Sequence, residues 1–110
     1  MSDILISGLR ANELLLSNAS SNIANMNTQD YKSIRTTIVE GAKGTVDTVT
    51  TRSTVEGVPT EDGHYTSNVD IPEEFGDIIL AQRGFEAVLS AIETREEMMT
   101  DLMNVLTGKN

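Results

Sequence analysis

The stretch DIPEEFGDIILAQRGFEAVLSAIETREEMMTDLMNVLTG, residues 70–108, decides the fold because it specifies one very long helix. Asp70 followed by Glu73 resembles a capping box, in which both side chains satisfy free backbone N–H groups at the helix start. Acidic residues here also complement the positive end of the helix dipole. Gly108 is a plausible stop. A helix from Glu73 to Leu106 would be about 51 Å long, which favours a rod-shaped molecule.

Apolar residues within this helix recur at heptad spacing and predict a coiled-coil seam. Two interleaved heptad series run through it, and only Gln82 and Glu96 interrupt them. The apolar residues of this seam are Phe75, Ile78, Phe85, Leu89, Ile92, Met99, Met103 and Leu106.

A second apolar series lies about 110° round the same helical wheel, and only Arg95 breaks it. Its early members are small, which suits the close approach of another helix. The rest of the chain offers no further partner, so we predict that this series contacts neighbouring subunits. The alternative is that it packs under the middle segment, which is short and polar. The series consists of Ala81, Gly84, Val88, Ala91, Met98, Leu102 and Val105.

The N-terminal residues, from 3 to about 25, predict a partner helix. Its seam contains Leu5, Leu9, Leu16 and Ile23, with Asn12 in the one polar core position. We expect this helix to pair with the C-terminal helix as an elongated coiled coil. Further apolar residues lie off the seam, so the helix has more apolar surface than a single partner would cover.

The middle segment, residues 34–68, is rich in Thr, Val and Gly, which favours extended backbone and turns. We expect at most a small β-hairpin and much irregular chain, because such a segment cannot form a core by itself. The fold class is therefore mainly α. The expected segments are an N-terminal helix with its exit turn (1–30), an extended or small β segment (31–69) and a C-terminal helix (70–110).

The composition narrows the class of protein. The net charge of −9 disfavours nucleic acid and anionic membrane surfaces as partners, since both require clustered Lys and Arg. The chain has no Cys and therefore no disulfide or thiolate site. No stretch has the ~18 apolar residues that span a bilayer. The N-terminus lacks the basic region of a cleavable signal peptide, because Asp3 stands in its place.

The sequence offers little for catalysis or cofactor binding. His64 lies beside Glu61 and Asp62, a set that could bind a metal. Without a second His or a Cys, a polar loop tip is the better interpretation. We expect the adjacent pair Glu73 and Glu74 to cap the helix or face solvent, not to act as an acid/base couple. We therefore predict no enzyme activity, no metal and no cofactor.

Two separate motifs resemble the signatures of flagellar basal-body rod and hook proteins. SGLRA (7–11), SNIANMNT (21–28) and DYKS (30–33) are similar to the N-terminal signature, and SNVDIPEEFGDIILAQRGFEA (67–87) is similar to the C-terminal one. Asp30 stands where the family usually has Gly; Asp tolerates positive φ better than most residues. The matching residues of the N-terminal signature are Asn22, Ala24, Asn25, Asn27, Thr28, Tyr31 and Lys32.

The resemblance implies a structural subunit of the flagellar rod, closest to a small proximal-rod protein of the rod protein C type. It implies terminal helices that pair and copies that stack helically into an axial tube, which transmits torque and conducts export. Its partners would be copies of itself, related rod proteins and the type III export apparatus, which would export it without a cleaved signal to the rod across the periplasm. The alternatives are a soluble helical adaptor or export-chaperone-like binding module and, third, a small enzyme using His64.

Overall fold

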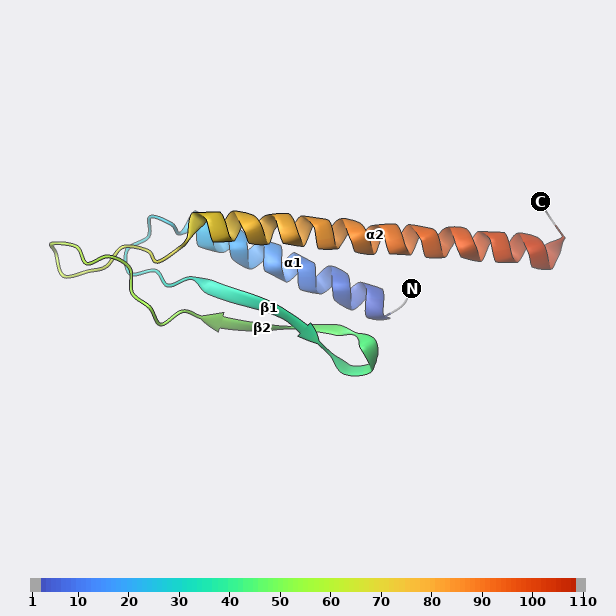
Figure 1. The fold of residues 1–110 in the computed structure, drawn as a ribbon, viewed down its shortest axis with the longest axis horizontal. Helices are drawn as coiled ribbons and strands as arrows, with labels where there is room; N and C mark the ends of the chain where they lie inside the picture. The colour runs from blue at the N-terminus through green and yellow to red at the C-terminus, as the bar shows by residue number, and fades with distance from the viewer. Residues whose placement is uncertain (1–2, 109–110) are drawn as a thin grey trace.

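The computed structural model describes residues 3–108 and has two helices joined by a hairpin and a loop (Figure 1). The molecule measures 77 × 25 × 14 Å. The prediction of a mainly helical, elongated chain with a short β segment is confirmed. Residues 1–2 of the predicted segment 1–30 and residues 109–110 of the predicted segment 70–110 lie outside the described part of the chain. The elements are α1 (Asp3–Ala24), β1 (Ile34–Glu40), a short 3-10 turn (Ala42–Gly44), β2 (Val46–Arg52) and α2 (Ile71–Thr107).

Helix α2 begins and ends at the residues that the sequence indicates. The Asp70 carboxylate accepts a hydrogen bond from the Glu73 N–H at 3.3 Å. Gly108 adopts a left-handed conformation, with φ 72°, and its N–H donates to the carbonyls of Asn104 and Val105. At 1.5 Å per residue, the 37 residues of α2 extend over about 55 Å. This helix therefore sets the length of the molecule.

The two helices pack antiparallel through small residues (Figure 1). A Cβ atom built on Gly8 would lie 3.2 Å from Cγ2 of Val88, and one built on Gly84 would lie 2.7 Å from Cγ of Asn12. Such contacts require that the two backbones approach closely. The buried apolar residues among residues 3–108 are Ala11, Leu15 and Ala19 from α1, and Ala81 from α2. Coiled-coil geometry in the finer sense stays a prediction.

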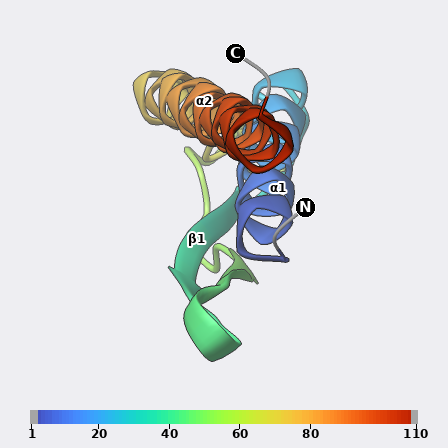
Figure 2. The same ribbon diagram turned by 90° about the vertical axis from the view of Figure 1, so that its right-hand side faces the viewer.

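The hairpin packs mainly on α1, on a face next to the one that α2 covers (Figures 1 and 2). Strands β1 and β2 pair antiparallel, with Ile34 opposite Arg52 and Glu40 opposite Val46. Hydrogen bonds along α1 fasten the hairpin to it, beyond those that Asn22 makes at the junction described below. Asn18 Nδ2 donates to Thr36 Oγ1 at 2.6 Å, and the Val46 N–H donates to Ser7 Oγ at 3.1 Å.

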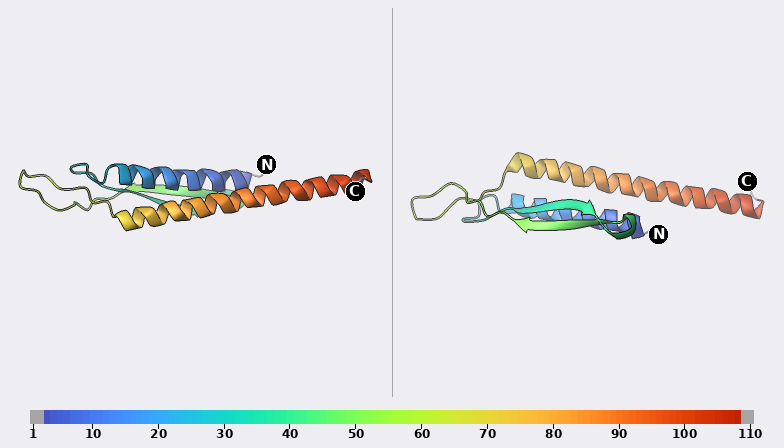
Figure 3. Two further views of the ribbon diagram at one scale, coloured as in Figure 1. Left: turned by 90° about the horizontal axis from the view of Figure 1, so that it is seen from above. Right: turned by 60° about the horizontal axis from the view of Figure 1, so that its bottom comes forward.

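A loop from residue 53 to residue 70 extends beyond the C-terminal end of α1 and then returns to start α2 (Figures 1 and 3). A short antiparallel bridge between Pro59 and Tyr65 closes its tip. The return brings the end of α1, the start of β1 and the start of α2 together. We call this meeting point the junction.

At its other end, α2 continues past the start of α1 (Figures 1 and 3). The antiparallel register that sets Gly8 against Val88 places Asp3 opposite Glu93. Residues 94–107 therefore extend beyond the described start of α1, and we call them the overhang. Within residues 3–108, neither helix is long and apolar enough to cross a membrane.

Candidate assembly surface and the junction at its base

One side of the overhang is apolar and exposed. On a wheel of 100° per residue its large side chains span an arc of about 160°, while Glu97, Thr100 and Asn104 lie on the opposite side. The exposed fractions of the large apolar side chains range from 50% to 76%. We call this group the overhang face; it consists of Met98, Met99, Leu102, Met103, Val105 and Leu106.

The overhang face continues the side of α2 that packs on α1. Ala81, Gly84 and Val88 fall in the same arc of the wheel, and all three lie against α1. Beyond the described start of α1, the apolar arc of α2 continues and is interrupted only by Arg95. Within the described part of the chain nothing packs on it. Contiguous exposed apolar surface of this kind marks an interaction site.

The predicted subunit-contact series divides into two groups. Ala81, Gly84 and Val88 pack within the chain, which corrects the expectation that they face a neighbouring subunit. The physical reason is that Gly8 and Asn12 leave room for a close helix pair. Ala91 is exposed, and the other three members belong to the overhang face: Met98, Leu102 and Val105.

The predicted coiled-coil seam supplies Asn12 to the closest approach of the helices, against Gly84, but its apolar residues lie to one side of that line. On α1 the apolar seam residues lie about 100° round the helix from the buried residues Ala11, Leu15 and Ala19. Leu5, Leu9 and Ile23 are half-buried, whereas Leu16 is exposed. Leu16 lines a groove between the helices with Ile78, Ala81 and Phe85. The remaining seam residues of α2 are half-buried Ile92, exposed Phe75 and Leu89, and three on the overhang face: Met99, Met103 and Leu106.

At the junction, the fully buried side chain of Asn22 connects three elements. Its Nδ2 donates to the Ile34 carbonyl at 2.7 Å and to Glu74 Oε1 at 2.9 Å. Its Oδ1 accepts from the Ile34 N–H and from the Tyr31 hydroxyl, each at 2.9 Å. The amide thus uses both donors and both acceptor positions. This part of the N-terminal signature therefore holds α1, β1 and α2 in register.

Glu74 is buried at the junction, 1% exposed, so the expectation that it caps the helix or faces solvent is wrong. Glu74 lies on the side of α2 that faces α1, two helical turns before Ala81. Burial raises the pKa of the Glu74 carboxyl, and the nearby charges of Asp77 and Glu73 raise it further. The Asn22 hydrogen bond and the Arg35 charge act in the opposite direction.

The other signature residues shape the end of α1 and the turn into β1. Ala24 is the last residue of α1. Asn25 Nδ2 donates to the Ser21 carbonyl at 2.8 Å, and Asn25 Oδ1 accepts from the Thr28 hydroxyl at 3.0 Å. These local bonds occupy polar groups at the helix end. Asn27 is exposed.

Arg52 at the end of β2 holds the exit turn. Its guanidinium lies 5.5 Å from the centroid of the Tyr31 ring, and its Nη1 donates to the Lys32 carbonyl at 2.7 Å. The turn is thereby tied to the hairpin as well as to Asn22.

Asp30 has φ 60°, so the expectation that Asp sustains a left-handed turn here is confirmed. Its carboxylate also binds the loop: Oδ1 accepts from the Tyr65 N–H at 2.8 Å, and Oδ2 lies 2.7 Å from His64 Nδ1. These two partners, the Tyr65 N–H foremost, hold the pKa of Asp30 below its ordinary value. His64 is thus a loop contact. Within residues 3–108 no group of three His, Cys, Asp or Glu side chains could hold a metal ion.

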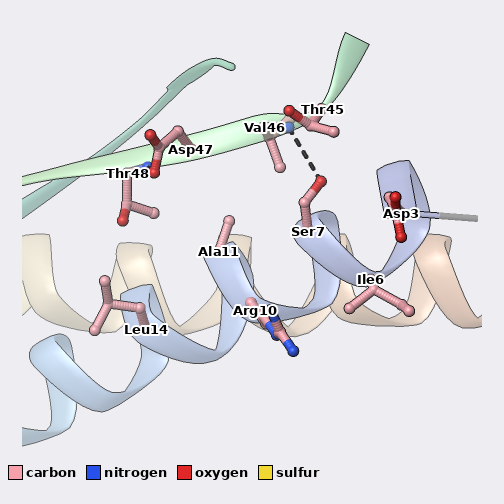
Figure 4. Close-up of a pocket in the computed structure, with 10 residues that line it drawn as sticks. All are labelled: Asp3, Ile6, Ser7, Arg10, Ala11, Leu14, Thr45, Val46, Asp47 and Thr48. Carbon is pink, nitrogen blue, oxygen red and sulfur yellow. Dashed lines mark hydrogen bonds between the residues drawn. The ribbon is translucent and has the colours of Figure 1, made fainter. Parts of the chain in front are cut away.

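A groove separates the first half of α1 from β2 (Figure 4). Ser7 and Ala11 point toward β2, whereas Arg10 points away from it. The bond from the Val46 N–H to Ser7 Oγ crosses the groove. The residues that line the groove are both polar and apolar, and their charged groups do not converge on one point. We therefore interpret the groove as the boundary between the hairpin and α1.

Residues 65–105 match the family model described as flagellar basal body rod FlgEFG protein C-terminal. The matched stretch runs from the end of the loop through most of α2, and it includes Glu74 and most of the overhang. A comparison with curated proteins gave no match. The matched stretch is therefore similar to the C-terminal part of flagellar basal-body rod proteins.

Proposed function

We propose that this chain is a structural subunit of the proximal rod of the bacterial flagellum, without catalytic activity. The observation that carries the proposal is the overhang face. It is a long apolar surface that continues an intrachain helix contact and has no cover among residues 3–108. The match of residues 65–105 to a rod-family model supports the same assignment.

The overhang face supplies a physical reason for assembly. Its six large apolar side chains are each at least half exposed. Covering their exposed parts would contribute roughly 5–11 kcal/mol, since full burial of one such side chain is worth about 1.5–3 kcal/mol. A helix that continues the position of α1 beyond its start would provide this cover. In the proposed rod, a neighbouring copy or a related rod protein supplies that helix.

The contact is heterologous, because the overhang face of one copy meets a different surface of the next. Such contacts generate open helical arrays when the rotation does not close. This suits an axial tube that transmits torque and conducts export. The coiled-coil pairing of the seam residues, the export through the type III apparatus without a cleaved signal, and the location across the periplasm belong to the same proposal.

The test compares Leu102→Asp with Thr100→Asp. Both positions are exposed on the same turns of α2, but only Leu102 lies on the overhang face. In cells that lack the native gene, we expect Thr100→Asp to restore motility and Leu102→Asp to fail. Circular dichroism of the purified variants should show equal helix content.

Fractionation identifies where the chain goes. The proposal requires the wild-type chain and Thr100→Asp in isolated basal bodies, and Leu102→Asp absent from them. Full motility with Leu102→Asp would refute assembly through the overhang face. A wild-type chain that stays in the cytoplasm, bound to secreted proteins, would refute the rod assignment in favour of the adaptor alternative.

A further inference from the structure

The buried carboxyl of Glu74 is a feature of the junction that the proposed function does not use. Its Oε1 accepts a hydrogen bond from Asn22 at 2.9 Å. Among the described residues, its Oε2 has no hydrogen-bond partner. The nearest cationic atom is Nη2 of Arg35 at 3.9 Å. That guanidinium already binds Glu73 at 2.7 Å and Asp77 at 2.8 Å.

The surroundings contain more negative than positive charge. Tyr31 and Asn22 contribute a neutral hydroxyl and a neutral amide. Strand β1 contributes the single guanidinium of Arg35, and α2 itself contributes the carboxylates of Glu73 and Asp77. An ionised Glu74 would be a third carboxylate beside one guanidinium, and it would be removed from water, which is costly. A proton on Glu74 removes that cost, while Oε1 can still accept from Asn22.

We propose that Glu74 is a proton-operated latch: its carboxyl is protonated when the junction is closed, and loss of the proton loosens the contact that joins α1, β1 and α2. The inference rests on the packing of Glu74 and is independent of the rod assignment. It concerns how firmly the two helices are held in register, whatever the chain assembles with.

The direction of the pH dependence follows from the burial of Glu74. Its pKa in the folded chain lies above the ordinary value of 4.5, so the folded chain binds this proton more tightly than the unfolded chain does. The resulting stabilisation is complete below about pH 4.5 and is lost as the pH rises through the pKa of the folded chain. Asp30 titrates on the acid side of this window, since its pKa is lowered from 3.8.

Glu74→Gln tests the latch, because glutamine keeps the shape and the acceptor oxygen but cannot ionise. The melting temperature of the full chain would be measured by circular dichroism from pH 4.5 upward. We expect the variant and the wild type to melt together at the acid end. Toward neutral and alkaline pH the variant should melt higher than the wild type. The difference between the two curves cancels the titration of all other groups.

Glu97→Gln is the matched control, because Glu97 is an exposed glutamate of the same helix that lies on the overhang, away from the junction. It should show no gain that grows with pH. A difference between Glu74→Gln and wild type that stays constant with pH would overturn the proposal.

A second measurement uses the wild-type chain and shows directly whether Glu74 is protonated, even if Glu74→Gln does not fold. The side-chain carboxyl carbon of Glu74 would be followed by NMR through a pH titration, together with the side-chain amide of Asn22. We expect the carboxyl to titrate above 4.5 and the Asn22 amide to shift with it. A midpoint at or below 4.5, or an amide that does not respond, would refute the latch.

Discussion

Replacing Gly84 with alanine would probe the closest approach of the two helices. The new Cβ would lie 2.7 Å from Cγ and 2.8 Å from Nδ2 of Asn12, well inside normal contact distance. The Asn12 side chain would have to move, although its Nδ2 donates to the Gly8 carbonyl at 2.9 Å. The substitution therefore forces either a wider helix pair or the loss of this hydrogen bond.

The magnitude follows from three contributions. Alanine gains about 0.5–1 kcal/mol over glycine inside a helix. Overpacking costs about 1–3 kcal/mol, and loss of the Asn12 hydrogen bond costs about 0.5–1.5 kcal/mol. We expect Gly84→Ala to lower the free energy of unfolding by about 1–3 kcal/mol, as measured by chemical denaturation of the full chain with circular dichroism detection.

Gly76 supplies the control within the same helix. A Cβ on Gly76 would meet no heavy atom within 4 Å, so Gly76→Ala should raise the free energy of unfolding by about 0.5–1 kcal/mol. The two changes are chemically identical, and the structure predicts opposite signs. Asn12→Ala, which removes the obstructing amide, should abolish most of the cost of Gly84→Ala in a double-mutant cycle. If Gly84→Ala stabilises the chain as Gly76→Ala does, the close approach described here is wrong.

Three further outcomes are expected. Asn22→Ala should lower the free energy of unfolding by at least about 3 kcal/mol, because it leaves several buried partners unsatisfied; a loss below about 1 kcal/mol would contradict its role at the junction. The hydrogen bonds from the Tyr65 N–H and from His64 lower the pKa of Asp30, so its charged form stabilises the fold above pH 3.8 and that stabilisation is lost as the pH falls through the lowered pKa. Asp30→Asn should flatten the acid side of the stability profile, and an unchanged profile would count against this clamp. In dilute chain, amides of residues 94–107 should exchange with solvent faster than α2 amides paired with α1, and equal protection would show that the overhang has a partner.

The helices and the hairpin could be predicted from the sequence because capping, turn and propensity signals act over only a few residues. Asp70 and Glu73 specify where α2 starts, and Gly108 specifies where it ends. The Gly-containing turns and the Thr and Val content indicated a small hairpin. Even the positive φ of Asp30 followed from the residue type at one position. None of these features depends on which distant segment packs nearby.

The choice of packing face could not be predicted in the same way. The apolar arc of α2 is broad enough that heptad spacing fits several registers equally well. The structure selects the register in which Gly8 and Gly84 bring the backbones close, and a seam of leucines would hold the helices farther apart. A usable signal was present on α1, where Ala11, Leu15 and Ala19 follow helical spacing and lead to Asn22.

The burial of Glu74 was missed because a capped helix start ordinarily exposes its acidic residues. Its partner Asn22 lies 52 residues earlier in the sequence, so no local pattern connects them. The spacing from Glu74 to Ala81 does place both residues on one side of α2. A glutamate on the packing side of a helix, combined with a buried asparagine in the partner helix, is the signal that would have identified the junction.

The residue type changes along one side of α2, which indicates that this side makes two different kinds of contact. Opposite α1, it carries small residues, Ala81 and Gly84, which fix a short distance to a partner in the same chain. Beyond the start of α1 it carries methionine and leucine, whose flexible or bulky side chains adapt to surfaces that are not built at the same time. The transition coincides with the described start of α1. A helix that only needed to be long would have no reason to change there, so the coincidence favours an overhang face made for contact with another subunit.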